Sequence, residues 1–263
     1  GIMYQHHEES LKILEDMFRG REEVIALVFG GSVAKGMERP DSDLDAMVIV
    51  TQEYFEQCMK ENRTAECLSG CTYEGGYFDI KYMTKDFLEQ AALKGSEPTR
   101  NSFVKSRVLF SRDPEIEGLV AAIPVFQEKE REEKLLSFFS DLELNYNYFW
   151  KCCKPDGYMK MRTGSEIVYA LYRLILQEKR VLFPCNRRLE AAVEGIEDKP
   201  EGFVEKCREF CESMDSDLLD EIVESYFAWT SYDYPKDHNI CCSQYCLDFE
   251  KWWLFPRPLI AEW

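Results

Sequence analysis

The first half of the chain contains short, mostly apolar segments. There are four of them, at Val24–Phe29, Leu44–Val50, Tyr77–Met83 and Arg107–Phe110. Segments of this length, bounded by polar or turn residues, indicate buried strands. The preceding segment Ser10–Arg19 repeats apolar residues every three or four positions, which predicts a helix. We therefore expect a sheet with flanking helices in this half.

Two further helices are predicted from their first residues. Thr84 is a capping residue ahead of an apolar pattern, and Asp113 followed by Pro114 is typical of the first turn of a helix.

After Pro124 the spacing of apolar residues becomes helical throughout. One long stripe begins at Leu135, a second follows Thr163 and Glu166, which have capping-box spacing, and a third begins at Leu219. The change of pattern predicts two domains, residues 1–125 with a mixed sheet and flanking helices, and residues 126–263 as an all-helical bundle. The expected fold class is α+β.

The overall charge narrows the range of partners. The chain of 263 residues carries 49 acidic and 32 basic side chains, a net charge of −17, divided about equally between the two halves. Nucleic acids and anionic membranes select basic surfaces, so neither is expected as a partner. No apolar run approaches the length of a membrane span, and the first nine residues are polar. A cytoplasmic location is therefore expected.

The chain has eleven cysteines and no CxxC pair. The favoured interpretation is a reduced protein that uses cysteine as a small buried hydrophobe. A zinc site formed by His238, Cys242 and Cys246, spaced four residues apart, is the alternative, although it lacks a clear fourth ligand.

The segment with the most chemical information begins where the first predicted strand ends. Gly30-Gly31-Ser32 forms a turn in which glycines allow close approach to a ligand, and free N–H groups and a hydroxyl favour an anion such as phosphate. Asp43 and Asp45 open the next predicted strand and point to the same face. Two neighbouring carboxylates without a basic partner repel each other, which is resolved when a divalent cation lies between them.

A third carboxylate lies on the strand at Tyr77–Met83. Asp79 and Lys81 are expected on one face of this strand, and the apolar residues on the other. A charged residue between apolar neighbours is costly unless it is paired or functional. Asp79 is therefore a candidate metal ligand or general base, and Lys81 a candidate partner of Asp79 or of a phosphate.

Gly30-Gly31-Ser32, followed by Asp43-Leu44-Asp45 and by Asp79 on a later strand, resembles the polymerase-β-like nucleotidyltransferase superfamily. The similarity is greatest to its antibiotic (aminoglycoside-type) nucleotidyltransferase branch and to uncharacterised relatives of that branch. The resemblance implies an N-terminal catalytic domain and a helical domain on the substrate side.

The resemblance also implies an activity. A nucleoside triphosphate such as ATP would bind over Gly31 and Ser32, Asp43 and Asp45 would hold Mg²⁺, and Asp79 would complete the metal site or accept a proton. An acceptor hydroxyl on a small molecule would take AMP, and pyrophosphate would leave. Further candidate nucleotide contacts are Lys35 in the loop after the turn, Lys81, and the basic pair Arg187 and Arg188 of the second half.

Two alternatives share the same fold. The chain could adenylylate a partner protein, as in toxin–antitoxin pairs, although the long helical half favours a small acceptor. It could also be a nucleotide-binding regulatory protein without catalysis.

Overall fold

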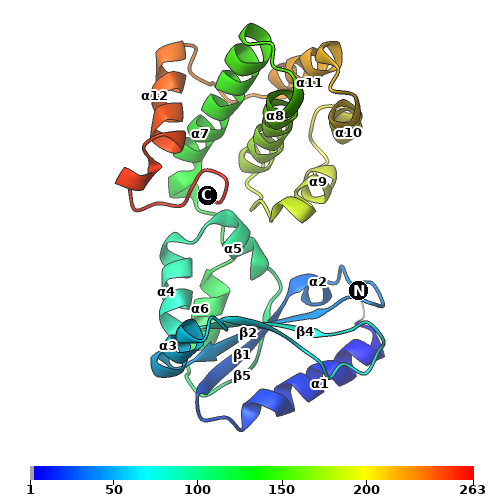
Figure 1. Ribbon diagram of the computed structural model, residues 1–263, viewed down its shortest axis with the longest axis vertical. Helices are drawn as coiled ribbons and strands as arrows, with labels where there is room; N and C mark the ends of the chain where they lie inside the picture. Colours follow the sequence, from blue (N-terminus) through cyan, green and yellow to red (C-terminus); the bar gives the residue numbers. More distant parts are fainter. Residues whose placement is uncertain (1–2) are drawn as a thin grey trace. The chain divides into compact units, whose positions relative to one another are not determined.

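The computed structural model describes residues 3–263 of the chain. It divides into two compact units, the first ending at Val125 and the second spanning Phe126–Trp263 (Figure 1). In the described part of the chain, no helix combines the length and apolarity needed to cross a membrane.

The first unit alternates helices and strands. Its elements in chain order are α1 (Gln5–Arg19), β1 (Val24–Gly30), α2 (Gly31–Ala34), β2 (Leu44–Val50), α3 (Gln52–Lys60), β3 (Ala65–Leu68), β4 (Phe78–Met83), α4 (Lys85–Lys94), α5 (Glu97–Ser102), β5 (Arg107–Ser111) and α6 (Ile116–Ala122). The four predicted strands are confirmed, as are the first helix and the helix capped by Thr84, whose hydroxyl accepts from the N–H of Phe87.

The strands form one mixed sheet in the order β3-β4-β2-β1-β5. The pair β2 and β4 is parallel, and the other three pairs are antiparallel. Because side chains alternate along a strand, each face of the sheet has its own apolar cluster. Helices α1 and α4 lie on opposite faces of the sheet (Figure 1). Phe18 of α1 belongs to one cluster with Phe29 and Val48, whereas Ile49 belongs to the other with Leu88 of α4.

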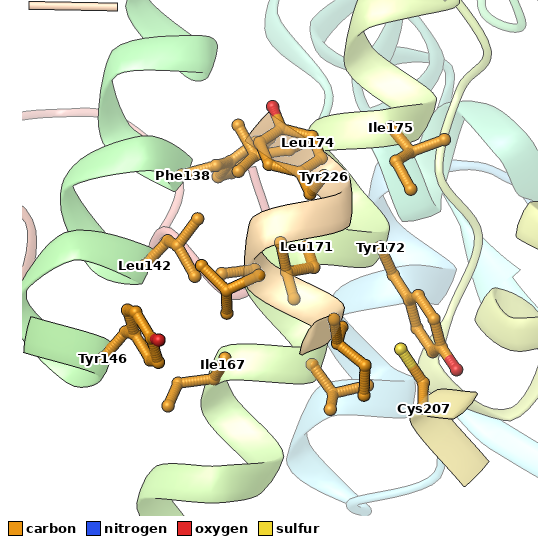
Figure 2. Packing of buried hydrophobic residues seen from close by; sticks show 14 of the residues in the cluster. Phe138, Leu142, Tyr146, Ile167, Leu171, Tyr172, Leu174, Ile175, Cys207 and Tyr226 are labelled. Carbon is orange, nitrogen blue, oxygen red and sulfur yellow. The ribbon is translucent and has the colours of Figure 1, made fainter. Parts of the chain in front are cut away.

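The second unit, residues 126–263, contains helices joined by loops and no strand. Its elements are η1 (Glu128–Glu130), α7 (Arg131–Glu143), the π-helical segment η2 (Leu144–Cys152), α8 (Gly157–Glu178), α9 (Asn186–Glu194), α10 (Phe203–Ser213), α11 (Ser216–Trp229), α12 (His238–Phe249) and η3 (Trp252–Leu254). One apolar cluster holds this unit together. Figure 2 shows Phe138 and Leu142 of α7 pointing toward Ile167, Leu171 and Leu174 of α8.

Two predicted helix starts were wrong. Helix α8 begins at Gly157, so Thr163 and Glu166 lie inside it and form no capping box, and Thr163 is only 1% exposed. The first turns of α8 carry large exposed residues such as Tyr158 and Met161, which hide the helix from a search for an apolar stripe. Helix α6 begins at Ile116, and Asp113 accepts from the N–H of Glu115 in the turn before it, at 2.9 Å.

Candidate active site

The turn after β1 is packed directly against a carboxylate. Gly31 has φ +75°, in the left-handed region that glycine adopts without strain. A Cβ atom built on Gly31 would lie 1.9 Å from Oδ2 of Asp45, so no side chain fits at this position. Glycine is therefore required at position 31 for two reasons: the backbone has a positive φ, and the Asp45 carboxylate leaves no room for a side chain.

Asp45 lies next to a second carboxylate across the sheet. Its Cα is in register with Gly30 on β1 and with Asp79 on β4. Both carboxylates are half-buried. Burial, the negative charge of Asp79 and a hydrogen bond with Asp79 raise the pKa of Asp45 to about 6, and the positive charge of Lys81 opposes this shift. The pair therefore resists carrying two negative charges, which is the situation that a bound cation relieves.

Asp43 is placed differently from the other two acids. It lies just before β2 and is half-buried, and a hydrogen bond with it raises the pKa of Tyr77 to about 12. Among residues 3–263, no group of three His, Cys, Asp or Glu side chains is placed so that it could hold a metal ion. The structure thus brings Asp45 and Asp79 together but does not assemble a three-carboxylate centre with Asp43. The metal role of these three residues stays a prediction.

The turn continues into α2 and a short loop. Ser32 is half-buried within α2, and Lys35 follows its last residue. The Nζ atom of Lys35 donates to Oδ1 of Asn101 on α5, at 2.9 Å. Sequence reasoning missed Asn101, because α5 was not predicted and its partner lies 66 residues away. Lys35 is therefore held beside the turn rather than left free in the loop.

The loop that leads from α2 to Asp43 is fixed by aromatic residues. The hydroxyl of Tyr73 donates to the carbonyl of Ser42, at 2.5 Å, and the N–H of Arg39 donates to the Ser42 hydroxyl, at 2.7 Å. His6 of α1 contacts the carbonyl of Pro40 through Nε2, at 2.8 Å. The contacts of Tyr73 and His6 join residues more than 30 positions apart, so no local pattern reveals them.

The basic residues that were predicted to contact the nucleotide lie in both units. On β4 the apolar residues Phe78 and Ile80 belong to the cluster on the α1 side, so Asp79 and the exposed Lys81 face the opposite side together. Arg187 and Arg188 lie in the first turn of α9 in the second unit, where Arg187 is exposed and Arg188 half-buried. Their part in nucleotide binding stays a prediction.

The cysteines only partly follow their predicted role. All eleven are free thiols, and five of them are exposed rather than buried. The Sγ atom of Cys242 lies 3.1 Å from Nε2 of His238 on α12, but with Cys246 these residues form no group that could hold a metal within residues 3–263. The zinc alternative is therefore not supported by the structure.

Two solved structures are similar to this chain at low sequence identity. A nucleotidyltransferase-like protein from Exiguobacterium sibiricum 255-15 is 11% identical, with 96% of this chain and 81% of that chain covered and a TM-score of 0.44. Spectinomycin adenyltransferase AAD(9) from Enterococcus faecialis, determined with ATP and spectinomycin, is 12% identical, with 92% and 96% covered and a TM-score of 0.33. Both TM-scores are too low to support a conclusion. Among curated proteins, none matches this chain.

The sequence of residues 7–112 matches a protein family described as the nucleotidyltransferase domain. This segment contains the Gly31 turn, both paired carboxylates and the strands that hold them. The match agrees with the resemblance that the sequence motif indicated. Residues 7–112 of this chain therefore match a nucleotidyltransferase domain, which makes up less than half of the 263 residues.

Proposed function

We propose that the protein transfers AMP from ATP to a hydroxyl group of a small acceptor molecule, with Mg²⁺ as cofactor and pyrophosphate as the second product. The observation that carries this proposal is the packing of the Asp45 carboxylate against Gly31, with Asp79 in register beside it. The turn suited to phosphate and the acids suited to a cation are thereby adjacent, in a domain of the matching family.

The residues present fit a magnesium ion. Two half-buried carboxylates on adjacent strands offer the hard oxygen ligands that Mg²⁺ prefers. The pKa of Asp45 is raised first by burial and second by the negative charge of Asp79, and a bound cation would oppose both effects. Asp45 and Asp79 would hold the ion, and Asp43, whose negative charge acts on Asp45, would add to the attraction for it. Bound there, Mg²⁺ would neutralise charge on the triphosphate and on the carboxylates.

The protein groups around the acids have distinct tasks in this proposal. The backbone N–H groups at Gly31 and the Ser32 hydroxyl donate to phosphate oxygens, and the ammonium groups of Lys35 and Lys81 add positive charge. Asp79 accepts the proton of the acceptor hydroxyl, which then attacks the α-phosphorus. For transfers of this kind, positioning and electrostatic stabilisation supply most of the rate.

The test is the double substitution Asp43→Asn with Asp45→Asn. Pyrophosphate release from ATP is measured with Mg²⁺ and a panel of hydroxyl-bearing small molecules. We expect activity to fall by at least about 100-fold, since each removed carboxylate weakens charge stabilisation in the transition state by several kcal/mol.

Asp41→Asn is the matched control. Asp41 lies in the same loop, carries the same charge, and has a side chain that is 69% exposed, so its loss should leave the rate unchanged. A double variant that transfers nucleotide as fast as the parent would refute the proposal. Intact mass spectrometry in the same assay detects nucleotide added to a protein instead of a small molecule, which would refute the acceptor class.

A further inference from the structure

The second unit contains a basic pocket that the proposed reaction does not use. It has a volume of about 400 Å³ and lies where η2, α8 and α11 meet, with Lys151, Lys154 and Lys160 in its lining. Small-molecule sites commonly have volumes of this order. The pocket is unusual because its unit carries more acidic than basic residues.

The three lysines do not pair closely with carboxylates. In the part of the chain that the structure describes, none of them forms an ion pair. Aromatic rings hold two of them instead, with Lys151 Nζ 4.3 Å from the ring centroid of Tyr146 and Lys160 Nζ 5.7 Å from that of Trp150. A ring face attracts an ammonium group without cancelling its charge, so the positive charge remains available to a ligand.

The remaining polar groups of the lining are compatible with an anion. Ser216 supplies a hydroxyl at the first residue of α11. Asp220 is the one carboxylate of the lining, and Tyr146 donates a hydrogen bond to its Oδ1 atom at 2.5 Å. Lys160 lies in the first turn of α8 and belongs to the same lining.

We propose that this pocket binds the phosphate group of a small molecule. Three lysines in one lining match the several oxygens and the charge of a phosphate, and a carboxylate ligand would use fewer of them. Trp150 borders the same pocket and offers an apolar surface to the rest of the ligand. The inference does not depend on the proposed transfer reaction, because none of these residues belongs to the Asp45–Asp79 site.

The experiment is calorimetric titration of the full chain with inorganic phosphate, pyrophosphate and AMP, in the presence of EDTA and at low salt. EDTA removes metal-dependent binding at the first unit. Saturable binding is expected for the parent protein. Lys151→Gln, Lys154→Gln and Lys160→Gln combined should lower the affinity at least about ten-fold, because each lost charged hydrogen bond weakens binding.

The matched control replaces three other lysines, Lys12→Gln, Lys60→Gln and Lys94→Gln, which are exposed and lie in the first unit. It changes net charge equally and should bind like the parent. Lys154→Gln alone should cause part of the loss of affinity. Because Lys154 is exposed, this single variant should fold normally and tests the pocket even if the triple variant misfolds. Tighter binding of AMP than of phosphate, abolished in the pocket variant, would identify a nucleotide as the source of the phosphate.

Two results would overturn the proposal. One is a parent protein that binds none of the three anions. The other is equal affinity in the pocket triple and the control triple, which would attribute binding to overall charge or to the first unit.

Discussion

At the level of single residues, Asp45 is held in an unfavourable electrostatic position. Its pKa rises from 3.8 to about 6, mainly through burial and secondarily through Asp79. A carboxyl group whose pKa is higher in the folded state stabilises the fold when protonated. This contribution is complete below about pH 3.8 and is lost as the pH rises through about 6. A carboxyl group whose pKa is shifted by burial and by a neighbouring acid is typical of a functional site.

Asp45→Asn should therefore stabilise the metal-free protein at neutral pH. The gain in free energy of unfolding is expected to reach at most about 3 kcal/mol, which is the size of the pKa shift converted at 1.36 kcal/mol per unit. It should vanish near pH 4, where the native carboxyl is protonated. Urea unfolding in EDTA, at neutral pH and near pH 4, measures this gain in free energy of unfolding, with Asp41→Asn as the control. An equal gain at both pH values would contradict the electrostatic cause.

The Gly31 turn can be tested with a second glycine of the same conformation. Gly31 and Gly75 have φ of +75° and +79°, but a Cβ at Gly75 would meet nothing within 4 Å. Both alanine substitutions carry the backbone penalty of about 1 kcal/mol, and only Gly31→Ala also displaces Asp45. We expect Gly75→Ala to keep full pyrophosphate release and Gly31→Ala to lose most of it. Equal activity of the two variants would contradict the proposal that contact between Gly31 and the Asp45 carboxylate is needed for catalysis.

At the level of elements, helices α7 and α8 are joined by a buried ion pair. Arg173 Nη2 lies 3.3 Å from Asp141 Oδ2, and both side chains are fully buried. Arg173 also donates to the carbonyl of Ile260, at 2.6 Å, so it ties the chain end to α8. Burial and the nearby Glu166 raise the pKa of Asp141, while Arg173 lowers it. Arg173 therefore supplies the positive charge that opposes protonation of this buried carboxyl group.

Removing Arg173 should leave an uncompensated buried acid. Arg173→Met is expected to lower the free energy of unfolding by about 3 kcal/mol at neutral pH, and by less in mild acid, where Asp141 takes up a proton. Arg180→Met is the matched control, because Arg180 pairs with Glu128 at positions that are 53% and 61% exposed. Urea unfolding of both variants decides the point. Similar losses of unfolding free energy in Arg173→Met and Arg180→Met would mean that the buried ion pair stabilises the fold no more than the exposed one.

The elements also show where sequence patterns succeed. Buried strands such as β1 and β2 are mostly apolar, with Asp45 as the one charged residue of β2, so they are recognisable without the fold. Strand β3 was missed because it is a short edge strand of four residues with exposed and half-buried positions, and it acquires its structure by pairing with β4. Edge strands carry little pattern of their own, since only one side of the backbone is paired.

At the level of the whole molecule, each unit has apolar clusters of its own. Leu174 of α8 belongs to the cluster of the second unit (Figure 2), whereas Leu27 of β1 belongs to a cluster of the first. Both side chains are fully buried, so truncating either one leaves a cavity that costs about 2–5 kcal/mol.

Leu174→Ala should therefore loosen the second unit selectively. Hydrogen exchange followed by mass spectrometry should show faster exchange in α7 and α8 and unchanged protection of β1 and β2. Leu27→Ala should produce the reverse pattern. Equal acceleration in both units by either variant would show that they unfold as one cooperative body.

The sequence by itself determined the sheet strands, the change to helices after Pro124, and the residues of the chemical motif. These features depend on local spacing, since apolar periodicity and turn glycines act over a few residues. Only the tertiary structure decided that Asp45 lies against Gly31, that Asp43 stands apart with Tyr77, and that Asn101 holds Lys35. It also decided that three lysines surround one pocket. Such placements depend on how strands and helices pack across long distances in sequence, which no local pattern encodes.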